Sequence, residues 1–355
     1  MSNFYWMPMK TATIMSLQGW GWNGHGQLGD GTMTTRLTPT PIGTDAWKMI
    51  ATGSSHSLGI RADGRLFSWG LNTSGQLGDG TTAHRLTPTP IGTDTWRMVA
   101  AGWDYSIGIR ADGRLFTWGD NWGGMLGDGT TTNRLSPTLI GVDFWKTVSA
   151  GQDHSLGINS NGQLFAWGQN ATGRLGDGTT TNRRSPTLIG VDFWRIISAG
   201  TGHSIGIRAD GRLLTWGLNT TGELGDGTTF EWHSPTLIGT DFWKTINAGR
   251  DYSFGIRADG RLFAWGNNWA GMLGDGTTIN RLSPTLIGVD VWKIIECGWN
   301  YTFGIRADGR LFSWGWNADG QLGDGTTTQR LAPTPIGTDT WRMVAAGWRH
   351  SLGMQ

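Results

Sequence analysis

"LGDGT" is the sequence of Leu28–Thr32, and the same five residues return six more times along the 355-residue chain. The later copies are Leu77–Thr81, Leu126–Thr130, Leu175–Thr179, Leu224–Thr228, Leu273–Thr277 and Leu322–Thr326, so that every step is 49 residues. A fixed period of this length indicates a solenoid, a propeller or an array. We therefore expect a single domain of 49-residue repeats over residues 14–355, preceded by an N-terminal extension, residues 1–13.

Each repeat contains four short apolar runs separated by turn residues. In one copy they are Thr95–Val99, Tyr105–Ile109, Leu115–Gly119 and Ser136–Gly141, named strands A, B, C and D. Runs bounded by Gly, Asp, Asn and Pro are typical of strands, and no segment has the 3.6-residue period of a helix. Asp-Gly between B and C predicts a hairpin, and Pro in D suits an edge strand. The sequence predicts an all-β fold, a seven-bladed β-propeller with four antiparallel strands per blade.

The two ends of the chain predict how the ring closes. The turn between strands B and C occurs six times, and the chain stops just after His350–Gly353, where a seventh would follow. The N-terminal region instead supplies a C strand and a D strand. We expect one blade built from both termini, with A and B from Thr340–Met354 and C and D from about Ile14–Ile42. This pairing leaves no open edge, whereas the alternative, an open solenoid, requires polar capping repeats that the sequence lacks.

Composition narrows the classes of function. The net charge of +1 predicts no long-range attraction to nucleic acid or to an anionic membrane, and no run of about 18 apolar residues is present. Cys297, the one cysteine, stands where other copies have Thr or Ala, so we expect a buried thiol. No secretory signal is visible at the N-terminus, which leaves the compartment open with the cytoplasm slightly favoured.

Two tryptophan positions recur in every repeat and are expected to be core or inter-blade packing. One is Trp47, Trp96, Trp145, Trp194, Trp243, Trp292 and Trp341, and the other is Trp20, Trp69, Trp118, Trp167, Trp216, Trp265 and Trp314. A third position alternates between His and Tyr: His56, Tyr105, His154, His203, Tyr252, Tyr301 and His350. Tyr in this ring argues against zinc, so we expect hydrogen bonds inside each blade.

No residue set in the repeats predicts catalysis or metal binding. GDGT lacks the other ligands of a calcium loop and is interpreted as a tight turn. The RADGR turns, found five times, are expected to form a self-neutralising charged surface. Because no nucleophile, base and orienting group stand apart from the repeat, we expect no enzymatic activity, no cofactor and no metal.

Tryptophans outside the two recurrent positions vary between copies and mark a candidate binding face. Trp103, Trp299 and Trp348 lie in A–B loops, and Trp22, Trp122, Trp269 and Trp316 lie in C–D loops. Antiparallel strands alternate in direction, so both kinds of loop emerge on the same face. Numbered by their LGDGT, blades six, seven and one carry five of these residues. With Trp232 on blade five and Arg349 beside Trp348, they predict an exposed aromatic patch for a partner.

The pattern WGxNxxGxLGDGTTxxRLxPTxIG, followed by a run such as HSLGI and DGRLFSWG, resembles the repeat of the regulator of chromosome condensation superfamily in a bacterial-like form. The resemblance covers about residues 14–355 and implies a seven-bladed propeller closed by both termini. The eukaryotic namesake exchanges nucleotide on a small GTPase and sits on chromatin by means of a tail and loop insertions. This sequence has no basic tail and no insertion in its equal spacings, so neither role is carried over.

The leading hypothesis is a non-enzymatic binding or scaffold propeller that presents the Trp-rich loop face to a protein partner. One alternative is UV-B sensing, because Gly347–Ser351, GWRHS, resembles the repeated GWRHT of the superfamily's plant photoreceptor. Another is glycan binding, because indoles stack on sugars. A third is a recently amplified or designed repeat with no evolved ligand. Nucleic acid and membrane are not expected as partners, and a homo-oligomer is left open without being predicted.

Overall fold

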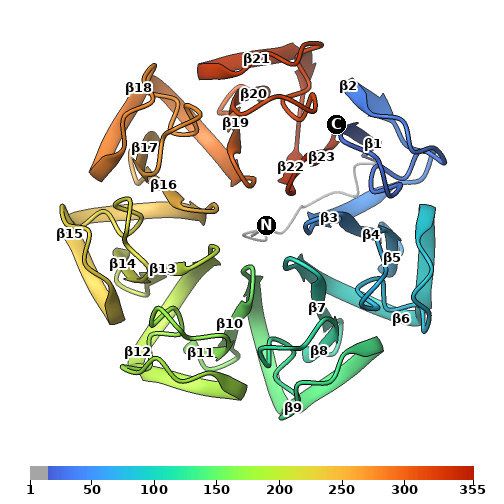
Figure 1. Ribbon diagram of the computed structural model, residues 1–355, viewed down its shortest axis with the longest axis horizontal. Helices are drawn as coiled ribbons and strands as arrows, with labels where there is room; N and C mark the ends of the chain where they lie inside the picture. The colour runs from blue at the N-terminus through green and yellow to red at the C-terminus, as the bar shows by residue number, and fades with distance from the viewer. Residues whose placement is uncertain (1–14) are drawn as a thin grey trace.

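The chain folds into a ring of seven four-stranded antiparallel sheets, each of which is one blade of a propeller (Figure 1). The computed structural model describes residues 15–355, and this part of the chain contains strands and turns but no helix. No segment of it could therefore cross a membrane as a helix. The predicted fold class is confirmed. The predicted N-terminal extension, residues 1–13, lies outside the described residues.

The blades are numbered by their copy of LGDGT, and their strands follow the chain. Blade 1 consists of β1 (Leu17–Gly21), β2 (Arg36–Pro41), β22 (Met343–Ala346) and β23 (His350–Met354). Blade 2 begins with β3 (Trp47–Thr52). The B strands of blades 2 to 7 are β4 (His56–Arg61), β7 (Tyr105–Arg110), β10 (His154–Asn159), β13 (His203–Arg208), β16 (Tyr252–Arg257) and β19 (Tyr301–Arg306). The C strands are β5 (Arg65–Gly70), β8 (Arg114–Gly119), β11 (Gln163–Gly168), β14 (Arg212–Gly217), β17 (Arg261–Gly266) and β20 (Arg310–Gly315).

The remaining strands are long because the predicted D and A strands are continuous. They are β6 (Arg85–Ala101), β9 (Arg134–Ala150), β12 (Arg183–Ala199), β15 (Trp232–Ala248), β18 (Arg281–Cys297) and the shorter β21 (Arg330–Thr340). The separate D–A turn predicted from the sequence is wrong for these strands, and only residues 42–46, between β2 and β3, interrupt the strand at this point. In β6 the first part pairs with β5 and the second with β7, and Gly92 at φ +60° lets the strand pass between blades.

Blade 1 is closed by the two ends of the described chain, as predicted. Its strand order is β2-β1-β23-β22, so the central pair joins one strand from each end. The pairing of β1 with β23 runs from Leu17 opposite Met354 to Gly21 opposite His350. The backbone N–H of Gln355 also donates to the carbonyl oxygen of Ser16 at 3.3 Å. The ring is therefore shut by a continuous ladder of backbone hydrogen bonds.

The two recurrent tryptophans form the core of every blade, and their predicted burial is confirmed. All fourteen are at most 5% exposed. In blade 3 the rings of Trp96 and Trp118 meet edge to face with centroids 5.8 Å apart. The indole N–H of Trp118 also donates to the carbonyl oxygen of Gln76, in the C–D loop of blade 2, at 2.9 Å. The strand C tryptophan thus fills its own blade and fastens it to the preceding one.

The His/Tyr position connects neighbouring blades, which corrects the prediction of bonds inside each blade. The imidazole Nε2 of His56 lies 3.0 Å from Ser106 Oγ, and the Tyr105 hydroxyl donates to the carbonyl oxygen of His154 at 2.6 Å. Equivalent contacts are made by His154 to Ser204, His203 to Ser253, Tyr252 and Tyr301 to the next blade's backbone, and His350 to Ser57. Because each link spans one blade boundary, the seven links form a closed polar belt. Cys297 is buried, as expected.

Candidate loop-face binding site

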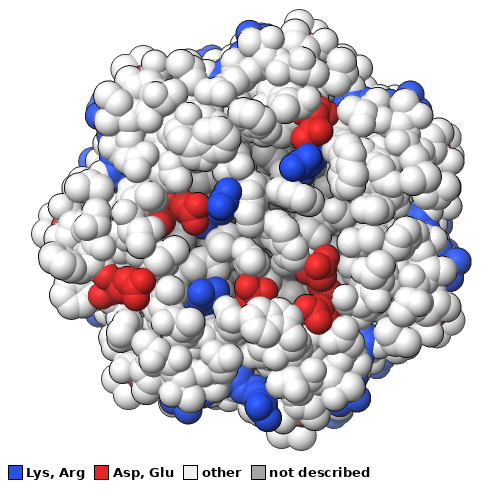
Figure 2. Space-filling model, in the orientation of Figure 1, with Lys and Arg blue, Asp and Glu red and all other residues white. Residues whose placement is uncertain are grey.

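The A–B and C–D loops emerge together on one face of the ring, as strand direction requires. The A–B loops lie around the axis, where Gly53, Gly102, Gly298 and Gly347 border a central hollow. The longer C–D loops lie farther from the axis, in front of their blades in Figure 1. Figure 2 shows that charged side chains on this face gather around the hollow, while the surface beyond it is mostly uncharged. We refer to this side as the loop face.

The repeated LGDGT holds each C–D loop in a fixed shape. In blade 3 the buried Asn121 accepts a hydrogen bond from the Leu126 N–H at 3.0 Å and donates to Asp128 at 3.2 Å. Asp128 also accepts from the backbone and hydroxyl of Thr130 and pairs with Arg134 at 2.6 Å. Partial burial opposes ionisation of Asp128, but the hydrogen bonds from Thr130 and Arg134 outweigh it and lower its pKa. The loops therefore present their variable residues on a rigid support.

Glycine in this motif is required by its backbone and by the next blade. Gly78 has φ +76°, and a Cβ there would lie 2.7 Å from Nε1 of Trp118. We expect Gly78→Ala to lower the free energy of unfolding by about 2–5 kcal/mol, from the left-handed backbone and the clash together. Gly92→Ala is the matched control, since Gly92 has φ +60° but no atom within 4 Å of the added Cβ. Denaturant unfolding should show a cost of only about 1–2 kcal/mol for the control; equal costs would contradict the inter-blade clash.

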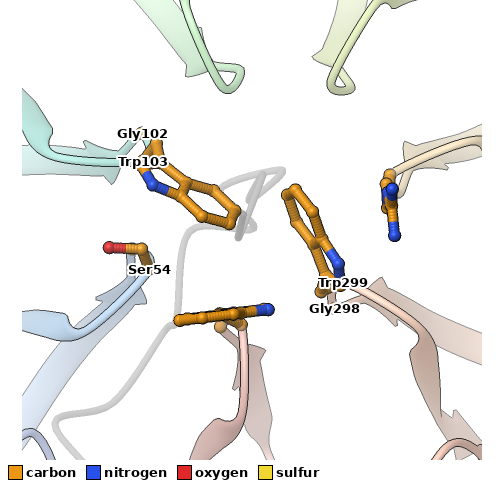
Figure 3. Close-up of a pocket in the computed structure, with 9 residues that line it drawn as sticks. Ser54, Gly102, Trp103, Gly298 and Trp299 are labelled. Atoms are coloured by element: carbon orange, nitrogen blue, oxygen red, sulfur yellow. The ribbon is translucent and has the colours of Figure 1, made fainter.

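Three predicted site residues meet over the axis instead of projecting into solvent. Trp103 and Trp299 lie side by side in Figure 3, with ring centroids 4.2 Å apart. The ring centroid of Trp348 lies 5.4 Å from that of Trp103. Arg250 lies over Trp299 at 4.5 Å, and Arg349 lies over Trp348 at 4.4 Å. The three indoles are half-buried by these contacts. The A–B loops converge on the axis, and side chains from blades 1, 3 and 7 therefore reach one another.

This indole cluster occupies the mouth of the central channel. The hollow that remains between the loops has a volume of about 10 Å³, which is room for about one water molecule.

Two half-buried carboxyl groups, those of Asp104 and Asp153, lie in A–B loops. Burial raises the pKa of Asp153 to about 6, and the nearby Asp120 and Asp104 act in the same direction, although Arg174 opposes them. Burial also raises the pKa of Asp104, which accepts a hydrogen bond from Ser54 Oγ at 2.8 Å. Within residues 15–355, no three His, Cys, Asp or Glu side chains are arranged to hold a metal ion.

A second aromatic group lies on the C–D loops of blades 5, 6 and 7. Trp269 is 46% exposed and contacts Trp316 of the next blade at 5.3 Å between centroids. Trp316 is half-buried against the core. Phe230 and Ile279 occupy matching positions on blades 5 and 6 and are 73% and 61% exposed. Phe230, Trp269, Ile279 and Trp316 are called the outer patch below.

Ile279 was not among the residues predicted for the site, although the sequence contains the signal that finds it. At its position the other blades have Thr34, Ala83, Thr132, Thr181, Phe230 and Thr328. Only blades 5 and 6 thus place a large apolar side chain here. A comparison of the copies by their tryptophans alone does not detect this difference.

The remaining predicted residues are dispersed. Trp232 takes the position at which the other blades have the arginine that pairs with the GDGT aspartate, and its indole donates to Asp226 at 2.7 Å. It is 43% exposed but also has this structural role. Trp122 is 54% exposed on blade 3, away from the outer patch. Trp22 is half-buried and contacts His25 edge to face at 5.1 Å.

Seven equal blades, a closing blade made from both ends and a variable loop face define a repeat β-propeller. The family model described as "Regulator of chromosome condensation (RCC1) repeat" matches residues 17–60, 63–109, 112–158, 161–207, 210–256, 259–305 and 308–354. The chain therefore belongs to the regulator of chromosome condensation repeat family.

Solved structures share this fold at low sequence identity. The crystal structure of human WBSCR16 aligns with a TM-score of 0.88 at 21% identity, over 96% of this chain and 99% of that one. Prp20p from Saccharomyces cerevisiae, described with its binding properties to Gsp1p and histones, aligns with a TM-score of 0.88 at 20% identity, over 97% and 92%. The structure of Kap60 bound to yeast RCC1 (Prp20) gives 0.87 at 19%, over 96% and 88%. No curated protein sequence matches the chain significantly.

Proposed function

We propose that this propeller is a non-enzymatic binding module whose loop face, centred on the outer patch, takes a protein partner. The observation that carries the proposal is the exposure of Phe230, Trp269 and Ile279 on adjacent blades, together with the contact from Trp269 to Trp316. Large aromatic side chains that share a surface are the usual anchors of protein interfaces. Single exposed apolar residues need no explanation, but a group confined to one sector of one face does.

Rigidity of the loops supports the same function. Each C–D loop carries the buried Asn and the Asp–Thr hydrogen bonds described for blade 3, so the anchors are held in place before a partner arrives. Such pre-organisation lowers the entropy that binding must overcome. The solved relatives give further support, since the Prp20 structures concern its binding to Kap60, Gsp1p and histones, all of them proteins.

Replacing the outer patch should abolish capture of the partner. Other blades show which residues the fold accepts at the four positions. They have Thr where Phe230 and Ile279 stand, and Thr73 and Thr220 where Trp269 stands. Leu71 and Leu218 occupy the position of Trp316. We expect the variant Phe230→Thr, Trp269→Thr, Ile279→Thr, Trp316→Leu to bind the partner at least about 100-fold more weakly. The partner would be identified by crosslinking to the immobilised chain in a lysate of its source, and the Kd measured by calorimetry.

The control variant carries Arg114→Gln and Arg212→Gln on the face opposite the loops. It should retain the wild-type Kd, and both variants should keep the wild-type unfolding temperature. Undiminished affinity in the folded outer-patch variant would reject this face as the site. Binding on a glycan array that depends on the same four residues would replace the protein partner with a carbohydrate.

A further inference from the structure

A second apolar surface lies away from the loop face, on four of the six long strands. It consists of Leu139, Val142 and Phe144 on β9, Leu188, Val191 and Phe193 on β12, Leu237 and Phe242 on β15, and Leu286, Val289 and Val291 on β18. These eleven side chains are 40–91% exposed, and the valines at 142, 191 and 289 are the most exposed of them. They are called the apolar arc. The function proposed above makes no use of it.

Strand register places the apolar arc beside the B–C turns, on the side of each blade opposite the C–D loops. Phe144, Phe193 and Phe242 pair with Arg114, Gln163 and Arg212, the first residues after the turns. A Cβ on Gly162, in the turn of blade 4, would lie 3.4 Å from Phe193. Strands β9, β12, β15 and β18 follow one another around the ring in Figure 1, so the four apolar segments lie on consecutive blades.

The fold does not need these apolar residues. Blades 1, 2 and 7 have polar or small residues at the same three positions, namely Pro41, Thr44 and Ala46, Pro90, Thr93 and Thr95, and Pro335, Thr338 and Thr340. Those segments share the glycine near φ +60° and the buried tryptophan that follows, and in blades 2 and 7 they are strands as well. These two blades show that Thr is accommodated at the second and third positions. The Val and Phe of the other four blades need a reason outside the folding of the monomer.

We propose that the apolar arc is a self-association surface and that its occupant is a second copy of this chain. With roughly 150–200 Å² for a fully exposed apolar side chain, the eleven residues present on the order of 1,000 Å², which reaches the roughly 800 Å² per partner of a stable interface. A second copy also repeats the spacing of the four segments, since both rings have the same repeat.

The acids within the arc are mostly paired inside the chain and do not oppose its burial. Each segment contains one acid and, three residues later, one base: Asp143 and Lys146, Asp192 and Arg195, Asp241 and Lys244, and Asp290 and Lys293. Asp192, Asp241 and Asp290 pair with Arg208, Arg257 and Arg306 of their own chain. These acids therefore need no partner across an interface. The long side chains of the bases can keep their charge in water while their apolar stems cover the arc.

Sedimentation velocity of the full chain across micromolar concentrations tests the proposal. We expect a dimer for the wild type. The arc variant Val142→Thr, Phe144→Thr, Val191→Thr, Phe193→Thr, Phe242→Thr, Val289→Thr, Val291→Thr should be a monomer, with Kd raised at least about 100-fold. A smaller variant, Val191→Thr and Phe193→Thr, guards against misfolding and should raise Kd about tenfold. The outer-patch variant is the matched control and should remain a dimer.

Three results would overturn the proposal. One is a wild type that stays monomeric at every concentration. Another is a folded arc variant that dimerises as tightly as the wild type. The third is a monomeric wild type that floats with phosphatidylcholine and phosphatidylserine vesicles while the arc variant does not, which would assign the surface to lipid. None of these readouts involves the partner of the loop face, so the two proposals fail separately.

Discussion

The protein should lose stability steeply as the pH falls below about 6.5, because four buried histidines of the polar belt accept no proton in the folded state. Burial lowers the pKa of His56, His203 and His350 to about 3, and that of His154 falls well below its usual value. Unfolded imidazoles bind protons below about pH 6.5. The contribution of these histidines to the free energy of unfolding is therefore complete above pH 6.5. It is lost as the pH falls toward 3, by about 1.4 kcal/mol per pH unit for each histidine.

The hydrogen bonds explain why these rings stay neutral. Ser106 donates its hydroxyl proton to the carbonyl oxygen of Gln76, so His56 must donate its own Nε2 proton to Ser106. The other ring nitrogen, Nδ1, is buried and has no hydrogen-bond partner within residues 15–355. A second proton on this nitrogen would create a buried positive charge whose N–H has no hydrogen-bond acceptor, and burial of such a charge is strongly unfavourable.

The tyrosines of the same belt provide the comparison. A variant with Tyr at positions 56, 154, 203 and 350 uses the residue that blades 3, 6 and 7 already have, and Tyr does not titrate between pH 4 and 7. Denaturant unfolding at pH 7 and pH 5 should show a drop of several kcal/mol for the wild type and none for the variant. Buried acids such as Asp153 act in the opposite direction, so the variant should be as stable at pH 5 as at pH 7, or more stable. Equal drops for the two proteins would contradict this account.

Deleting residues 350–355 should prevent the ring from folding. The deletion removes β23, which pairs with β1 on one side and β22 on the other. It also removes the fully buried Leu352 and Met354 and the belt link from His350 to Ser57. The combined loss is on the order of 10 kcal/mol, comparable with the whole stability of an ordinary domain. Circular dichroism and thermal unfolding should show no cooperative transition.

A circular permutant tests whether folding needs the pairing of β1 with β23 in blade 1 or the natural position of the chain ends. Gln355 can be joined to Ser16 through Ala-Asp-Gly, the turn of the other blades, while the chain is opened between Asp112 and Gly113. The permutant should unfold cooperatively at or above the wild-type temperature, because blade 1 then has a covalent hairpin. Deletion of Gln355 alone should leave the protein folded. A truncated chain lacking β23 that melts like the wild type would show that the shared blade is not needed.

The sequence was sufficient for the architecture because the repeat is nearly exact. Its period, turn residues and incomplete first and last copies predicted seven blades and the closing blade. The continuity of D and A was missed, because Gly92 between two strands indicates a turn in sequence, while the strand continues through it from one sheet into the next. The direction of the His/Tyr bonds was also missed. Ser57 and its equivalents follow this position in every copy, and only the packing of blades shows that the serine of the next blade is the nearer one.

The candidate site was harder to predict than the fold. Tryptophan position assigned Trp103, Trp299 and Trp348 to the correct loops, but sequence spacing does not show that loops from blades 1, 3 and 7 converge on the axis. The outer patch and the apolar arc were both encoded as departures from the repeat. Ile279 and Val191 replace threonine, and a comparison of every position across the seven copies would have found them.

The long strands have a mechanical consequence. Since β6, β9, β12, β15 and β18 each serve two adjacent sheets, tension applied to one sheet is transmitted along covalent backbone into the next. A single blade cannot unfold on its own, because its outer strand is continuous with the inner strand of the next blade and pulls that strand out of its sheet. Hydrogen exchange of backbone amides in the buried strands should accordingly occur only through global unfolding of the whole ring.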